Sequence, residues 1–346
     1  MHIFTRFLKG IFFALLFSAI PSFAMQLGDK MKTGQKGDYI VTEQDKTYTV
    51  LLLRSKDDSH VVLEEISAPA SVLPAGTDWK KWVQEGAKGH TSWTMYEIDT
   101  KSFSLLEAYS FTKRGWLFCS EDEDFLTKLM RLSLTKVQEE ERKKVGPIPH
   151  SDEIDRRKTW NPSIKIEGKK QKIHCSAFKA VWPKDDTLLS GCSITLYFPS
   201  DGRNFFFPCW IEASNGHFTQ AIKTVDSGRG MVSAIQQNIP RRPPKISSIK
   251  KHEDKVRMQI TSAPYYRRFK VFAFDITRPF EHIGPLPFTH IPSEQKGNIA
   301  LETSQSRLSE FLSSGHRYKW IVIPEESNIF YVESEDIFLW PNVGSR

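Results

Sequence analysis

The sequence predicts a mainly β protein with two folded parts, and three observations support this. The chain contains 24 Phe, 9 Trp and 9 Tyr but few runs of helical periodicity, a composition that favours strands. Apolar runs flank Asp201-Gly202 and Asn215-Gly216, and such pairs indicate hairpins because tight β-turns need positive φ. The proline-rich stretch Pro240–Pro244 then interrupts the pattern. We therefore predict a large antiparallel sheet over 37–238, a linker over 239–244 and a smaller β-sandwich over 245–340.

The first 24 residues have the pattern of an export signal. Two basic residues precede the apolar run Ile11–Ile20, and small residues at Ser22 and Ala24 suit a signal peptidase that cuts before Met25. The run is short against the roughly 20 residues of a transmembrane helix. We expect a signal peptide over 1–24, a periplasmic or secreted protein, and no transmembrane segment after cleavage.

The larger part is expected to consist of consecutive antiparallel strands. Within residues 46–54, Tyr48, Val50 and Leu52 alternate with Thr47, Thr49, Leu51 and Leu53. Both faces of this strand are therefore nearly apolar, which predicts a central position in the sheet. The segments 193–198, 205–213 and 218–225 form a predicted meander. The remaining strands are expected at 38–41, 60–66, 91–98, 104–111, 115–119, 163–167 and 173–178.

Two helices are expected against this sheet. Asp78 suits the N-cap of a short helix over 79–85, with Trp82 facing inward. A longer helix is predicted over 121–134, because Ser120 and Glu123 form a capping box before an apolar stripe. The stripe, which we expect to cover a face of the sheet, consists of Phe125, Leu129 and Leu132, with Leu126 and Met130 beside them.

The smaller part contains a recognisable spacing before one of its strands. Strands are expected at 245–250, 255–262, 269–276, 318–324, 329–333 and 337–340, with a proline-rich loop through Pro292. Leu312-x-x-Gly315-x-x-Tyr318 resembles the tyrosine corner of fibronectin type III and related immunoglobulin-like domains. The resemblance implies an immunoglobulin-like β-sandwich, a Tyr318 hydroxyl bonded to backbone near 312–315, and a role in interaction or spacing. The long loop 278–292 departs from that pattern.

The larger part resembles the bacterial periplasmic lipoprotein carriers and related exported half-barrels. The likeness rests on the leader, the sequential strands, the capped helix, and the aromatic stretches Thr91–Phe111 and Tyr197–Thr224. It implies a curved sheet (a half-barrel) with a covering helix, whose concave face binds acyl chains or another apolar ligand. The alternative is that the same aromatics fill a packed core. The candidate ligand-binding residues are Trp93, Tyr96, Phe125, Leu129, Met130, Phe206 and Trp210.

Four cysteines, Cys119, Cys175, Cys192 and Cys209, have no Cys-x-x-Cys spacing. An oxidising compartment permits several disulfide pairings among them, and Cys192 and Cys209 fall on neighbouring predicted strands. The alternative is that all four are small buried hydrophobes.

Three short patterns invite a catalytic interpretation and none is convincing. Asp226-Ser227-Gly228 resembles the loop of aspartic proteases, but that chemistry needs two carboxylates and the chain has one copy. Ser247-x-x-Lys250 falls on a predicted strand, which does not set the lysine one helical turn from the serine. Cys209 with His174 and His217 lacks a thiol-protease signature.

Metal and cofactor patterns are weaker still. The adjacent His174 and Cys175 point to opposite faces of a strand, and no glycine-rich phosphate loop follows a strand. We predict no catalytic residue, no metal site and no cofactor. The net charge of +7 falls to +5 once Arg6 and Lys9 of the leader are removed, and this mild charge suits an anionic envelope partner better than nucleic acid.

These observations leave three functional hypotheses. The first is a non-catalytic envelope protein that binds an apolar ligand or a lipoprotein. The second is a structural or adaptor protein that acts through protein contacts, and the third is a hydrolase with an unrecognised site. A lined cavity favours the first, a filled core the second and a convergent polar cleft the third.

Overall fold

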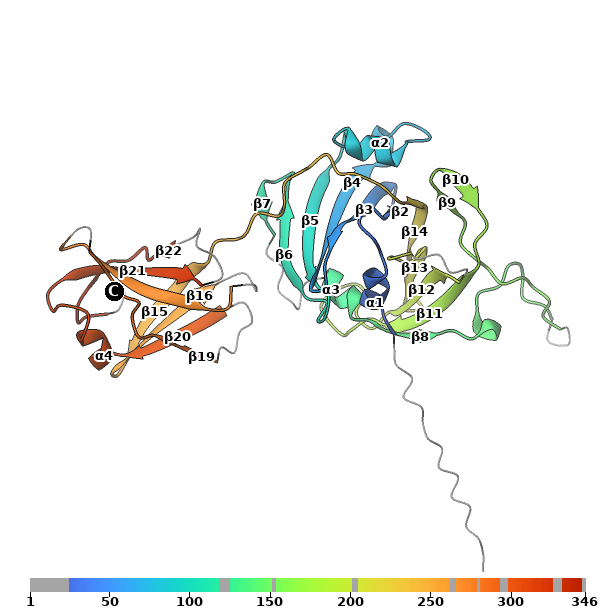
Figure 1. Cartoon of the computed structure of the whole chain (residues 1–346). Helices are drawn as coiled ribbons and strands as arrows, with labels where there is room; N and C mark the ends of the chain where they lie inside the picture. The colour runs from blue at the N-terminus through green and yellow to red at the C-terminus, as the bar shows by residue number, and fades with distance from the viewer. Residues whose placement is uncertain are drawn as a thin grey trace, which may run out of the picture.

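The computed structural model describes residues 25–117, 125–150, 154–200, 205–261, 266–278, 281–292, 298–325 and 332–343. It is mainly β, with a large antiparallel sheet and separate smaller sheets, as the sequence predicts (Figure 1). The leader expected over 1–24 and the capping box of Ser120 and Glu123 lie outside the described residues. No helix in the described part is long and apolar enough to cross a membrane.

Within the described chain, twelve strands form one sheet in the order β1-β8-β11-β12-β13-β14-β2-β3-β4-β5-β6-β7 (Figure 1). Neighbouring strands in the sheet are antiparallel throughout. The strands are β1 Met25–Gln26, β2 Tyr39–Gln44, β3 Thr47–Lys56, β4 His60–Pro69, β5 Ser92–Asp99, β6 Leu105–Ser110, β7 Gly115–Trp116, β8 Ser133–Lys136, β11 Cys175–Val181, β12 Ser193–Pro199, β13 Trp210–Ser214 and β14 Thr219–Gly228.

Local turn chemistry explains why several of these strands pair in sequence. Asp45 and Lys46 both have positive φ, 47° and 61°, so the two-residue turn between β2 and β3 is tight. Gly216 has a φ of 89° in the turn between β13 and β14. The predicted meander β12–β13–β14 is confirmed, although β13 begins at Trp210 rather than Phe205. The central position of β3, between β2 and β4, is also confirmed.

Three short α-helices pack on the large sheet: α1 Leu27–Lys32, α2 Trp79–Gln84 and α3 Phe125–Met130, with 3₁₀ turns at Ala70–Val72 and Glu139–Glu141. The α2 helix is capped as predicted, because the Asp78 carboxylate accepts the Lys81 N–H at 3.2 Å. Its buried side chains are Trp79 and Val83, whereas the expected Trp82 is only half-buried. The prediction that the third helix extends to 134 is wrong, because residues from Ser133 onward pair with β11 and β1 as β8.

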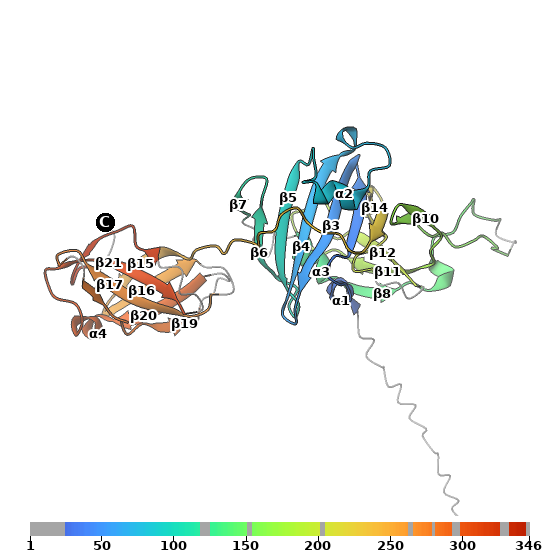
Figure 2. The same cartoon turned by 45° about the horizontal axis from the view of Figure 1, so that its top comes forward.

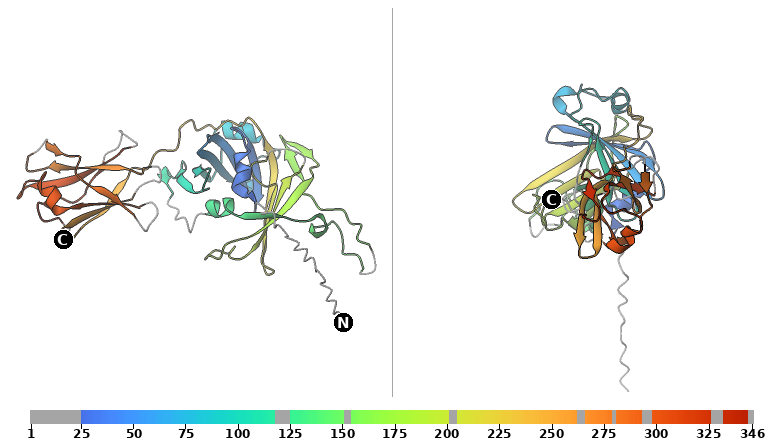
Figure 3. Two further views of the ribbon diagram at one scale, coloured as in Figure 1. Left: turned by 60° about the horizontal axis from the view of Figure 1, so that its bottom comes forward. Right: turned by 90° about the vertical axis from the view of Figure 1, so that its left-hand side faces the viewer.

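The two faces of the sheet have separate hydrophobic cores. On the concave side, α1 and α3 lie within the curve of the sheet, and Leu27, Met31 and Met130 pack against Ile40 and Leu63 (Figures 1 and 3). On the opposite face, α2 lies against β3 and β4 (Figure 2). Alternation along the strands produces this division, because successive side chains point to opposite faces.

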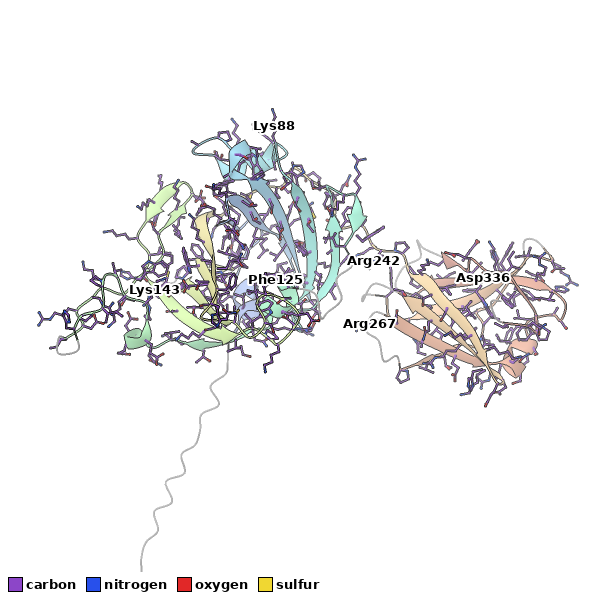
Figure 4. All side chains as sticks on the ribbon, turned by 180° about the vertical axis from the view of Figure 1, so that it is seen from behind. Lys88, Phe125, Lys143, Arg242, Arg267 and Asp336 are labelled. Atoms are coloured by element: carbon purple, nitrogen blue, oxygen red, sulfur yellow. The ribbon has the colours of Figure 1, made fainter. Side chains whose placement is uncertain are left out.

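The segment that follows β14 contacts the outer face of the sheet, so Arg242 in the expected linker is half-buried, whereas Arg241 is exposed. Arg242 pairs with Glu107 at 2.7 Å, and Arg241 pairs with Glu97. The Trp116 indole N–H donates to the Pro240 carbonyl at 2.8 Å. Figure 4 labels Arg242 where the chain leaves the large sheet. Glu97 on β5 and Glu107 on β6 are buried, and a buried carboxylate is costly unless it is paired with a cation, which the two arginines supply.

The C-terminal part contains two smaller sheets, in the orders β15-β16-β20-β19 and β18-β17-β21-β22, with β23 also pairing with β21. Their strands and one helix are β15 Lys245–His252, β16 Lys255–Thr261, β17 Phe269–Asp275, β18 Glu281–Ile283, β19 Thr289–Ile291, β20 Asn298–Ser304, α4 Gln305–Ser309, β21 Arg317–Pro324, β22 Val332–Glu333 and β23 Phe338–Leu339. Both sheets contribute to one core, in which Met258 and Leu301 meet Val271 and Trp320. The structure adds β20 and α4, which were not predicted, and places β18 and β19 within the expected proline-rich loop.

The predicted role of Tyr318 is confirmed. Its side chain is fully buried, and its hydroxyl accepts the Ser313 backbone N–H at 2.9 Å. The ring lies 5.7 Å from that of Phe338, so the side chain joins the core to the loop before β21.

Candidate functional site

A pocket of about 390 Å³ lies where β2 begins and β14 ends, and we call it the β14 pocket. Its volume falls within the range of about 300–1,000 Å³ that small-molecule sites occupy. The first wall comes from β2, the second from the end of β14, the third from a small hairpin and the fourth from the segment before β13. The lining residues are Asp38, Tyr39, Ile40, Ile166, Glu167, Phe205, Phe206, Ser227, Gly228 and Arg229.

The small hairpin, β9 Ile164–Ile166 and β10 Lys169–Gln171, reaches the pocket because β14 bulges. The register between β14 and β2 shifts between Thr224 and Asp226. Pairing of β14 with β13 has by then ended at Lys223. Beyond that point the Glu167 N–H donates to the Ser227 carbonyl at 2.8 Å. The tip of the hairpin therefore takes the place of β13 along this edge of β14. A bulge beside a site is a recurring way to re-aim side chains.

Glycine is required at one position of the pocket wall. A Cβ added to Gly228 would lie 2.7 Å from the Tyr39 hydroxyl and 2.9 Å from Glu167 Cγ. Only the absence of that Cβ lets the Tyr39 side chain cross β14 at this point, since real Cβ contacts are never so short. Gly228 pairs with Tyr39 in the sheet, so this close approach is fixed by register.

The walls of the pocket are mainly apolar. Ile40 and Phe206 are buried in the concave core, with Phe205 half-buried beside them, and the half-buried Ile166 packs against a separate cluster that contains Ile164. Tyr39 is only 3% exposed and belongs to the core of the outer face. Its burial, with Asp226 and Glu167 nearby, raises the pKa of the Tyr39 hydroxyl, which therefore stays neutral.

Two carboxylates at the pocket rim are already engaged. Asp38 accepts the Gln35 backbone N–H at 2.8 Å and lies 3.5 Å from Nε of Arg229. Glu167 lies 2.6 Å from the Lys80 ammonium, which lowers the pKa of that carboxyl. Lys80 also lies over the Tyr39 ring, 5.9 Å from its centroid, and so links α2 to the pocket.

Asp226 lies on the other side of the hairpin, beside a second pocket of about 380 Å³ that Trp79 and Lys165 also line. Its carboxylate accepts the N–H groups of Gly168 at 3.2 Å and Ser227 at 2.9 Å. Burial nevertheless raises the pKa of Asp226, because desolvation disfavours its charged form. Among the described residues, no hydrogen bond joins Asp226 to a second carboxyl group, so the arrangement lacks a proton-sharing carboxylate pair.

The structure distributes the candidate ligand residues over several sites, and of them only Phe206 lines the β14 pocket. Trp93 lies in the outer-face core and donates to Glu64 at 2.5 Å. Leu129 and Met130 are buried beneath the concave face, with Tyr96 half-buried against the same core. Trp210 belongs to a third cluster and lies 5.2 Å from Trp160. Phe125 is 46% exposed and stacks on Trp182.

The cysteines and the short catalytic patterns are also dispersed. Cys175 and Cys192 are buried free thiols, and Cys119 lies outside the described residues. Although Cys192 and Cys209 flank neighbouring strands, they lie at opposite ends of the β12–β13 pair and do not face each other. Ser247 and Lys250 are on β15, the predicted strand. The described part of the chain contains no cluster of His, Cys, Asp and Glu that could hold a metal ion.

Residues 49–172 match the model of a family described as CT021 protein. The matched segment includes β3 to β6 and the β9–β10 hairpin, but neither β2 nor β14. A solved structure described as the hypothetical protein CT021 from Chlamydia trachomatis is 21% identical to this chain. That alignment covers 63% of this chain and 98% of the other, with a TM-score of 0.45. No curated protein matches the chain.

Proposed function

We propose that this chain is an exported, non-catalytic protein whose large sheet binds an apolar ligand in the β14 pocket. The observation that carries the proposal is a pocket of about 390 Å³ bordered by Tyr39, Ile40, Ile166, Phe205 and Phe206. Protein interiors are normally filled to the density of organic crystals, so a space of this size beside five large apolar side chains is suited to a ligand. The leader-like N-terminus supports the assignment to the periplasm or the exterior.

The pocket has a different place in the fold from the one the lipoprotein-carrier likeness suggests. Helices α1 and α3 fill the lower concave face, where Met130 is fully buried. The proposed ligand therefore does not contact α3. It lies between the sheet and the β9–β10 hairpin, whose tip bonds to β14 through the Glu167 N–H to the Ser227 carbonyl and the Gly168 N–H to the Asp226 carboxylate.

A second proposal concerns the C-terminal part, which we assign as an immunoglobulin-like module for protein contacts. When the strands are lettered in chain order from β15 to β22, one sheet has the spatial order A-B-E-D and the other the order C′-C-F-G. The hydrogen bond between Tyr318 and the Ser313 backbone supports the same assignment, because a tyrosine corner stands at the start of strand F. This module would support the adaptor hypothesis if the pocket binds nothing.

A fluorescent fatty-acid probe tests the ligand proposal. The parent protein should enhance the fluorescence of the probe saturably. Ile166→Glu should weaken binding by about tenfold or more, because it sets a charge on an apolar wall. Ile166 is half-buried on a short hairpin, so the fold should tolerate the change. Ile154→Glu is the matched control, since Ile154 is 80% exposed and lies outside the pocket. A parent protein that binds no such probe would discard the proposal.

A further inference from the structure

Some polar groups around the β14 pocket already have hydrogen-bond or ion-pair partners within the protein, and others do not. Its two acidic side chains have partners: Asp38 has the Gln35 N–H and the Arg229 guanidinium, and Glu167 has Lys80. A ligand cation would therefore have to compete with groups already bound at both carboxylates. The pocket is poorly suited to an amine or a quaternary ammonium on this ground.

The pocket groups that can still form hydrogen bonds with a ligand are donors. The Arg229 side chain is 64% exposed and contacts Asp38 through Nε, and its Nη groups make no hydrogen bond within the described chain. The Tyr39 hydroxyl likewise has no hydrogen-bond partner among the described residues, although it lies at the pocket wall next to Gly228. A guanidinium offers a planar fork of N–H donors that matches the oxygens of a carboxylate or phosphate.

The charge of the hairpin beside the pocket favours the same ligand class. Lys165, Lys169, Lys170 and Lys172 are all exposed and, within the described residues, make no ion pair. Glu167 is the one acidic residue between Ile164 and Lys172, and Lys80 neutralises it. The hairpin therefore projects a positive field over the mouth of the pocket, which raises the local concentration of anions.

We infer that the ligand of the β14 pocket is an amphiphile with an anionic oxygen head group, a carboxylate or a phosphate, held by Arg229 and the Tyr39 hydroxyl. This inference rests on the proposed function, which supplies the apolar tail. The tail lies against Ile166, Phe205 and Phe206, and the head group lies at the rim, where the hairpin lysines neutralise its charge. Asp38 positions the guanidinium from the side that the ligand does not occupy.

Three competitors with one twelve-carbon tail test the head group: lauric acid, dodecyl phosphate and methyl laurate. Each is titrated against the fluorescent probe bound to the parent protein. We expect the acid or the phosphate to displace the probe at concentrations about tenfold lower than the neutral ester does. The better of the two anions identifies the head group as carboxylate or phosphate. An ester that competes as well as both anions would overturn the inference.

Variants of Arg229 assign the effect to that residue. Arg229→Gln should remove the advantage of the anions while leaving displacement by methyl laurate unchanged, which shows that the pocket is intact. Arg229→Lys should keep part of the advantage, because it retains the charge but not the fork. Arg257→Gln, on an exposed position of β16, is the control. An anion preference that survives in Arg229→Gln would overturn the inference, whereas a parent that binds no probe would refute the proposed function itself.

Discussion

Nη2 of Arg242 lies 2.7 Å from a carboxylate oxygen of Glu107, whose side chain is fully buried. The pair joins the segment after β14 to β6, although 135 residues separate the two along the chain. Burial raises the pKa of Glu107, and the guanidinium opposes that rise. The prolines of Pro240–Pro244 prevent this segment from joining the sheet through backbone hydrogen bonds. The side-chain ion pair explains how the segment is nevertheless held against the sheet.

Replacement of Arg242 by methionine should destabilise the part of the protein that contains the large sheet. The change leaves a buried carboxylate without its cation, and we expect a loss of about 3 kcal/mol in the free energy of unfolding. Urea denaturation followed by tryptophan fluorescence measures it. Arg257→Met, at an exposed position, should change little. An unchanged midpoint for Arg242→Met would show that the ion pair does not hold the segment.

The Tyr318→Phe variant tests the hydrogen bond to Ser313. The change removes only the hydroxyl, so the Ser313 N–H loses its acceptor while the ring stays in the core. Because Ser313 is exposed and water can partly replace the hydroxyl, we expect a loss of about 1 kcal/mol. Tyr48→Phe is the control, since that hydroxyl has no hydrogen-bond partner in the described chain. Equal midpoints for Tyr318→Phe and the parent would refute a stabilising role for this bond.

Two substitutions on α3 separate core packing from ligand contact. Met130 is fully buried and Phe125 is 46% exposed, although both belong to one short helix. Met130→Glu should cost several kcal/mol, because an unpaired charge is buried, whereas Phe125→Glu should cost about 1 kcal/mol or less. Thermal unfolding measures both. If Met130→Glu folds normally and loses probe binding, the ligand lies on the concave face and not in the β14 pocket.

Asp226 makes a pH dependence testable. Burial raises its pKa in the folded protein, so the folded state holds this proton more tightly than the unfolded state does. The stability that Asp226 contributes is therefore largest at acidic pH and is lost as the pH rises through the raised pKa. Asp226→Asn should gain stability relative to the parent as the pH rises from about 4, the ordinary pKa of an aspartate, through the raised pKa of the folded state. A stability difference that stays constant over this range would contradict the raised pKa.

Local sequence signals predicted the strands well because their information is short-range. Asn215-Gly216 marks the connection between β13 and β14, where Gly216 has positive φ, and alternation identifies the strands beside it. The end of α3 was predicted too late for a physical reason. Leu132 fits the helical stripe, but pairing of Ser133–Lys136 with its neighbours outweighs helical propensity.

The site was much harder to predict, because its residues come from four distant segments. Tyr39, Ile166, Phe205 and Arg229 meet only after β14 bulges and the hairpin occupies the edge beyond β13. No single stretch of sequence therefore contains a signal that these residues lie together. Asp226-Ser227-Gly228 resembles a protease motif in the sequence. In the structure the residue that matters here is Gly228, because a Cβ at this position would clash with the Tyr39 side chain. Similarly, the aromatic stretches contribute mainly to separate cores.

Photo-crosslinking tests the central claim, that an amphiphile occupies the β14 pocket, most directly. A fatty acid with a diazirine in its tail is irradiated with the parent protein, and the modified peptides are identified by mass spectrometry. We predict that the label is found on peptides that contain Ile166 or Phe205 and that excess lauric acid suppresses it. Label on α3 or on the C-terminal strands alone, or label that lauric acid does not suppress, would contradict the account.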